Sequence, residues 1–112
     1  MKKQKTSIEN QFKIGKTLIG KCFINKRFQE MIKCIFITGT ENINGDCFLK
    51  TLDITYSIKD GEVYLACAET GTWGYESILT KNFYGFCEID MDVFTKHYNV
   101  VQNKIFSYLK QG

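Results

Sequence analysis

The chain has 112 residues, a length typical of one domain, and 44% of them are hydrophobic while 24% are charged. Nine Phe and six Tyr exclude a disordered chain, because disordered segments are poor in aromatic residues. The net charge of +3 is smaller than the basic excess that a dedicated DNA-binding domain usually carries. We therefore expect a single domain over residues 1–112, with a basic, frayed terminus over residues 1–5.

The sequence predicts neither export nor membrane insertion. No apolar stretch follows the basic start, and no run approaches the ~20 apolar residues that span a membrane. The cysteines are odd in number, contain no C-x-x-C pair and lie beside bulky apolar residues: Cys22, Cys34, Cys47, Cys67 and Cys87. We expect all five to be reduced core residues of a cytoplasmic protein, in the bacterial cytosol or in a host cytosol if a phage encodes the chain.

The first elements of the chain are a short helix and two strands. Ser7 is a good N-cap, and Ile8 and Phe12 are four residues apart, which predicts a helix over residues 6–13. Residues 17–25 favour a strand with a bend at Gly20. Residues 31–38 are apolar on both faces, which is typical of a central strand.

Two hairpin turns organise the middle of the chain. Asn44-Gly45 and Asp60-Gly61 are dipeptides that accept the positive φ angles of tight hairpins. Between them, apolar residues alternate with the polar series Thr51, Asp53, Thr55 and Ser57. This alternation predicts a strand with one buried face and one solvated face. Residues 63–68 return as its partner.

The last third of the chain is predicted as a loop over residues 69–74, strands over 75–79 and 83–89, and a helix over 91–110. Apolar residues with spacings of three and four carry the helix prediction, and Asp90 is suited to cap it. The expected fold is α+β: an antiparallel meander of five to six strands with a C-terminal helix. The antiparallel region would cover residues 17–89, as an open sheet or as an SH3-like or OB-like barrel.

No group of residues predicts a catalytic, metal or cofactor site. Gly15-Lys16-Thr17 resembles the end of a phosphate-binding loop, but the expected earlier glycine is Asn10 and no helix is predicted to follow. His97 is the only histidine and lies next to the apolar stripe of its helix, so we expect a boundary residue. Glu88, Asp90 and Asp92 are interpreted mainly as capping and dipole-facing acids.

The loop around the single tryptophan is the strongest candidate for an interface. Trp73, Tyr75 and Glu76 follow one another in a glycine-rich segment. Aromatic side chains bury large areas with little loss of rotamer entropy, so they are favoured anchors at protein interfaces. A packing role for Trp73 and stacking of its ring on nucleic-acid bases are the alternatives.

We expect a non-enzymatic module that binds and regulates or inhibits a macromolecular partner, most plausibly a protein. The abundance of Lys, Ile, Asn, Phe and Tyr and the absence of proline suggest AT-rich coding. This composition favours a phage or bacterial accessory protein, such as an inhibitor of a defence enzyme or an immunity-type protein. Homodimerisation is compatible with an exposed sheet edge.

Two alternative functions remain open at this stage. One is a small nucleic-acid-binding β-barrel, which would use basic residues and lose affinity steeply with salt. Its binding residues would be Lys2, Lys3, Lys5, Lys13, Lys16, Lys21, Lys26 and Arg27. The other is a small enzyme or ligand-binding protein, which would require a deep pocket holding polar groups such as His97 or Glu88.

Overall fold

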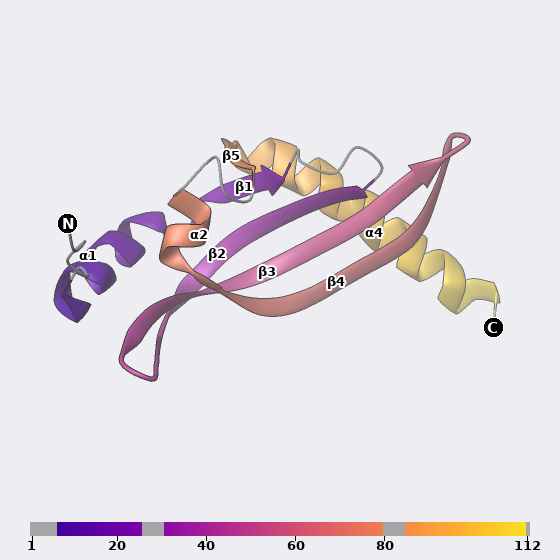
Figure 1. Ribbon diagram of the computed structural model, residues 1–112. Coiled ribbons are helices and arrows are strands. Elements are labelled where there is room, and N and C mark those ends of the chain that lie inside the picture. The colour runs from indigo at the N-terminus through magenta and orange to yellow at the C-terminus, as the bar shows by residue number, and fades with distance from the viewer. Residues whose placement is uncertain (1–6, 26–30, 80–84, 112) are drawn as a thin grey trace.

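An antiparallel sheet of five strands with helices on both faces makes up the fold (Figure 1). The computed structural model describes residues 7–25, 31–79 and 85–111. The elements in chain order are α1 (Ile8–Leu18), β1 (Cys22–Asn25), β2 (Met31–Ile43), β3 (Asp46–Lys59), β4 (Glu62–Gly74), α2 (Tyr75–Leu79), β5 (Phe86–Ile89) and α4 (Met91–Gln111). The predicted α+β class and the antiparallel pairing are confirmed.

The sheet is open, so the alternative of a closed SH3-like or OB-like barrel is wrong. Its strand order is β4-β3-β2-β1-β5, which leaves β4 and β5 at opposite edges. Closure would require these edge strands to pair with each other. Instead, the four-residue β5 pairs with the four-residue β1, far from the 13-residue β4. The molecule is elongated, with principal extents of 54 × 25 × 24 Å.

Both predicted hairpins are confirmed. Asn44 and Gly45 have φ angles of 52° and 83°, and Asp60 and Gly61 have φ angles of 53° and 80°. Positive φ at both central residues gives a turn whose twist matches that of the flanking strands. The two turns set the register of β3, which pairs with β2 on one side and with β4 on the other.

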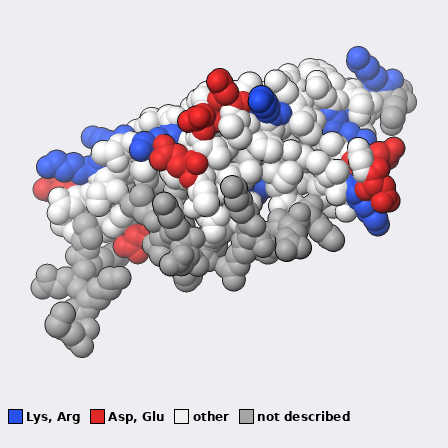
Figure 2. All heavy atoms as spheres, turned by 90° about the horizontal axis from the view of Figure 1, so that it is seen from above, with Lys and Arg blue, Asp and Glu red and all other residues white. Residues whose placement is uncertain are grey.

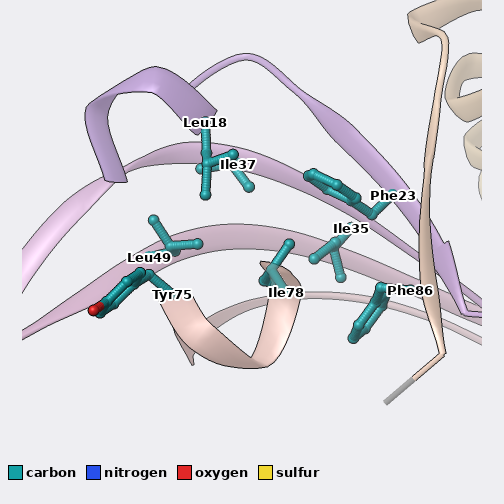
Figure 3. Packing of buried hydrophobic residues seen from close by; sticks show 8 residues of the cluster. All are labelled: Leu18, Phe23, Ile35, Ile37, Leu49, Tyr75, Ile78 and Phe86. Carbon is teal, nitrogen blue, oxygen red and sulfur yellow. The ribbon is translucent and has the colours of Figure 1, made fainter. Parts of the chain in front are cut away.

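Each face of the sheet carries its own hydrophobic cluster. On the face covered by α1 and α2, which we call the α1–α2 face, the cluster contains Leu18, Phe23, Ile35, Ile37, Leu49, Tyr75, Ile78 and Phe86 (Figure 3). On the opposite face, the α4 face, the buried residues are Cys22, Cys34, Ile54, Tyr56, Phe94 and Val101. Successive side chains of a strand point to opposite faces, so the sheet contributes to both clusters at once.

The helix α1 is longer than the predicted helix over residues 6–13. Its N-cap is Ser7, whose Oγ accepts a hydrogen bond of 3.3 Å from the N–H of Asn10. The helix continues to Leu18, so the predicted strand over residues 17–25 is wrong in its first part. A Cβ on Gly15 would lie 3.1 Å from the Sγ atom of Cys47, which shows how closely α1 approaches the sheet.

The segment after β3 differs most from the sequence-based expectation. Residues 69–74, predicted as a loop, extend β4, because Glu69 to Gly74 pair with β3 residues back to Phe48. Residues 75–79, predicted as a strand, form the helix α2. Tyr75 and Ile78 are three apart, share one helical face and are both buried in the α1–α2 cluster. The strand β5 begins at Phe86, and residues 80–84 lie outside the described ranges.

The C-terminal helix α4 confirms the helix predicted over residues 91–110. It crosses the sheet obliquely, starting over β1, where the Sγ of Cys22 lies 3.9 Å from the Sδ of Met91. Farther along, Phe94 contacts Phe36 with ring centroids 5.9 Å apart. Its C-terminal end projects past β4 (Figure 1). No helix in the described ranges combines the length and apolar character needed to cross a membrane.

Candidate functional site

The indole of Trp73 is held in place on the α1–α2 face by three contacts. Its ring is half-buried and packs edge-on against Phe86, with centroids 5.3 Å apart and an interplanar angle of 85°. Its Nε1–H donates a hydrogen bond of 3.1 Å to Oδ2 of Asp53. The Nζ of Lys33 lies 5.3 Å from the ring centroid, within range of a cation–π interaction. Trp73 is thus partly a packing residue.

The polar face predicted for β3 is buried, which corrects the expectation that it is solvated. Thr51, Asp53 and Ser57 retain 2%, 5% and 3% of their accessible surface. Asp53 accepts hydrogen bonds from the Thr51 hydroxyl, at 2.6 Å, and from Trp73. These bonds compensate for the loss of hydration that burial imposes on a carboxylate. Gly71 lies opposite Thr51 on β4 and leaves room for Asp53.

Of the predicted interface residues, Glu76 is exposed and Tyr75 is largely buried. The ring of Tyr75 lies beside Leu49 at the edge of the α1–α2 cluster, with its hydroxyl directed away from the cluster (Figure 3). That hydroxyl donates a hydrogen bond of 3.3 Å to Oε1 of Glu76. The two residues therefore act together at the surface, Glu76 through its carboxylate and Tyr75 through its hydroxyl.

A surface hollow of about 230 Å³ lies at this point, between α1, α2 and the hairpin of β2 and β3. It is lined by Gln11, Asp46, Cys47, Phe48, Gly74, Tyr75 and Glu76. On its inner side, Oε1 of the buried Gln11 accepts a hydrogen bond of 2.9 Å from the N–H of Cys47, which joins α1 to β3. Two of the three predicted interface residues, Tyr75 and Glu76, thus line one concave surface. We call it the Glu76 hollow.

Sequence analysis missed the other lining residues of the Glu76 hollow. Asp46 and Phe48 follow the Asn44-Gly45 turn, and Gln11 lies on α1, which makes them distant from Glu76 in sequence. The turn signal located the hairpin correctly. Only the docking of α1 and α2 onto the sheet brings these residues to Glu76, and the sequence pattern contains no signal for that docking.

The basic residues of the alternative nucleic-acid function are only partly within the described ranges. Lys2, Lys3, Lys5, Lys26 and Arg27 lie outside them. Lys13 and Lys16 are exposed on α1, and the Nζ of Lys21 lies 3.8 Å from Oε1 of Glu88. In the described ranges, eleven Asp and Glu residues outnumber nine lysines. Figure 2 shows basic and acidic side chains interleaved over the visible face.

The only histidine of the chain is engaged in a hydrogen bond on the α4 face. The Nδ1 atom of His97 lies 2.6 Å from the hydroxyl of Tyr56, a buried residue of β3. Burial lowers the pKa of His97 and raises the pKa of Tyr56, so the contact favours a neutral imidazole beside a protonated tyrosine hydroxyl. This placement matches the boundary position expected for His97.

The cysteines divide into two groups, which corrects the expectation that all five belong to the core. Cys22, Cys34 and Cys47 are buried, whereas Cys67 and Cys87 are exposed on the edge strands β4 and β5. Burial, reinforced by the nearby Cys22, raises the pKa of Cys34 to about 12. A thiol with such a pKa is a poor nucleophile at neutral pH. Within the described part of the chain, no three His, Cys, Asp or Glu side chains gather as metal ligands would.

Comparisons with protein-family models, with curated proteins and with solved structures found no match to this chain.

Proposed function

We propose that this protein is a non-enzymatic interaction module that binds a partner protein and regulates or inhibits it. The observation that carries this proposal is the Glu76 hollow, a concave surface lined by two aromatic residues, Phe48 and Tyr75, and two acidic residues, Asp46 and Glu76. Concave sites with an apolar wall and a few placed polar groups are typical binding sites.

The chemistry of the Glu76 hollow favours a basic side chain of the partner. Lys and Arg carry a long apolar stem and a cationic end, so they cover apolar surface while the charge stays near water or a carboxylate. Phe48 and Tyr75 would contact the stem, and Glu76 would accept hydrogen bonds from the cation. Arginine fits best, because its planar guanidinium can stack on a ring and bind a carboxylate through two N–H groups.

The residues around the hollow support binding in preference to catalysis. Its one thiol, Cys47, is buried, and burial raises the pKa of that thiol. The histidine of the chain lies on the opposite face of the sheet and is hydrogen-bonded to Tyr56. A small chain can inhibit a partner by covering the partner's own site. The composition favours a phage or bacterial accessory protein, and the specific form of the proposal is therefore an inhibitor of a defence enzyme or an immunity-type protein.

A minimal ligand tests the proposal directly. In two-dimensional NMR spectra, Nα-acetyl-arginine methylamide is expected to shift the signals of Phe48, Tyr75 and Glu76, with a Kd on the millimolar scale. The substitution Glu76→Lys should weaken this binding at least about threefold, because it replaces an attraction by a repulsion. Glu88→Lys changes another exposed glutamate, on β5 at the opposite edge of the sheet, and is expected to leave the binding unchanged.

Two results would contradict the proposal for this site. One is that the arginine derivative shifts signals elsewhere on the molecule but not those of the hollow. The other is that Nα-acetyl-glutamate methylamide shifts the same signals equally, since this would show that the carboxylates do not select a cation.

A further inference from the structure

The strand β4 presents an open edge along the length of the molecule. It pairs only with β3 among the described strands, so its other side has no neighbour in the sheet. Alternate residues of such a strand direct their N–H and C=O groups away from the sheet, where they can pair with an added strand. A bulge at Leu65, which has a φ of 55°, interrupts the strand near its start. Pairing with β3 is regular from Cys67 to Gly74, so the edge around residues 66–72 lies almost wholly beyond the bulge.

The end of α4 projects beyond this edge on one side of the sheet. Ala68 of β4 and Phe106 of α4 both line a groove of about 260 Å³ on the α4 face. Phe106 and Leu109 are 49% and 69% exposed, high values for large apolar side chains of a helix that packs on a sheet. A strand added beside β4 would lie under this projecting turn, so its side chains on the α4 face would contact Phe106 and Leu109.

The other side of the same edge carries one exposed carboxylate, that of Glu69. Glu69 pairs in register with Asp53, so it lies on the α1–α2 face, and its side chain is exposed. The stretch 62–74 contains Glu62 and Glu69 and no Lys or Arg. An antiparallel pairing of two copies centred on residues 66–72 would place Glu69 opposite Glu69 of the second copy. Like charges in directly opposed positions are destabilising, so this register disfavours a second copy, whereas a basic residue opposite Glu69 would be attracted.

We propose that the β4 edge binds an extended segment of a partner protein in which basic and apolar residues alternate. The apolar residues would pack under Phe106 and Leu109, and the basic residues would face Glu69 on the other side of the sheet. Main-chain hydrogen bonds to residues 66–72 would supply the affinity, as in other cases of strand addition. This inference rests on the proposed protein-binding function and names the kind of segment that is bound.

The probe for this inference is a blocked heptapeptide of alternating Val and Lys, with a matched peptide of alternating Val and Glu as control. The readout is alkylation of the two exposed thiols, followed by mass spectrometry. Cys67 lies on β4 and Cys87 lies on the opposite edge strand, so the second thiol is an internal control. The basic peptide should slow alkylation of Cys67 about tenfold at about 90% occupancy and leave Cys87 unchanged.

Matched substitutions at exposed positions identify the contacts. Glu69→Lys is expected to weaken binding of the basic peptide about three- to tenfold and to strengthen binding of the acidic peptide. Glu41→Lys should change neither. Leu109→Lys should weaken the basic peptide as well, because it removes apolar contact area and adds a like charge. Val93→Lys, at the start of the same helix, is the control for that change.

The inference is overturned if both peptides protect Cys67 equally, if Cys87 is protected to the same extent, or if neither peptide protects Cys67. It is also overturned if Cys67 becomes protected in the protein alone as its concentration rises, since a second copy would then occupy the edge. If β4 fails to bind while the Glu76 hollow still binds arginine, this inference alone fails. If the hollow also fails, the protein-binding function fails with it.

Discussion

At the residue scale, Asp53 is a buried carboxylate that links neighbouring strands through side-chain hydrogen bonds. It accepts from Thr51 on its own strand and from Trp73 on β4, and it does so in the space left by Gly71. A Cβ built on Gly71 would lie 2.7 Å from Oδ2 of Asp53, closer than real side chains approach. The Asp53 carboxylate therefore occupies the space that a side chain at position 71 would need.

This packing predicts that Gly71→Ala destabilises the protein by about 1–3 kcal/mol, the usual range for overpacking a buried site. Displacing the carboxylate would also break its bond to the indole, so the fluorescence of the single tryptophan should change. Gly39→Ala is the control, because the nearest atom to a Cβ at Gly39 is 3.9 Å away. Urea denaturation of the two variants measures the difference, and equal stability would show that Asp53 has room to move.

At the element scale, α4 is joined to β3 by the hydrogen bond between His97 and Tyr56. Desolvation lowers the pKa of His97 below its ordinary value of 6.5, so the folded protein favours the neutral ring. The unfolded chain then binds a proton more readily than the folded protein as the pH falls through 6.5. Stability must decrease as the pH falls through the window from 6.5 down to the lowered pKa of the folded state.

We therefore expect urea denaturation to show lower stability at about pH 5.5 than at about pH 7.5, at most about 1.4 kcal/mol per pH unit for one proton. In His97→Gln the part of this dependence that comes from His97 should disappear, since Gln does not titrate and can still accept a hydrogen bond from Tyr56. NMR titration of the His97 ring gives its pKa directly. A value at or above 6.5 would show that the ring is hydrated, contrary to the packing described here.

The sequence predicted correctly those elements that have strong local signals. The hairpins at Asn44 and Asp60 and the helix α4 follow from local signals, namely turn dipeptides and apolar spacing over many residues. The helix α2 has only five residues, too few to distinguish helical spacing from strand alternation. Residues 69–74 contain two glycines and resemble a loop, but pairing with β3 makes them strand. Tertiary contacts therefore determine both the helical conformation of α2 and the strand conformation of residues 69–74.

The candidate site was predictable only in part, for a related reason. Trp73 and Glu76 were identified because a lone aromatic residue and an acid in a glycine-rich segment are conspicuous in sequence. The sequence did not predict that the polar series on β3 is buried, because alternation alone assigns these residues to the solvated face. Its burial depends on Trp73 and Lys33, which come from other strands. Alternation identifies the two faces of a strand, but it does not show what covers each face.

At the scale of the whole molecule, the fold carries two separate candidate binding surfaces. The Glu76 hollow lies where α1 and α2 cover one face, and the projecting end of α4 lies beyond the β4 edge. Both surfaces combine apolar side chains with carboxylates, and both favour basic groups of a partner.

The most direct test of protein binding is purification of the tagged chain from cells of its source at about 0.15 M and about 1 M salt. We predict an equimolar partner protein that persists at high salt, because aromatic packing and strand pairing are little screened. The complex should be weakened by Glu76→Lys and unaffected by Glu88→Lys, a change on the opposite edge strand. Recovery of nucleic acid that dissociates at high salt, with no protein sensitive to Glu76→Lys, would contradict the account.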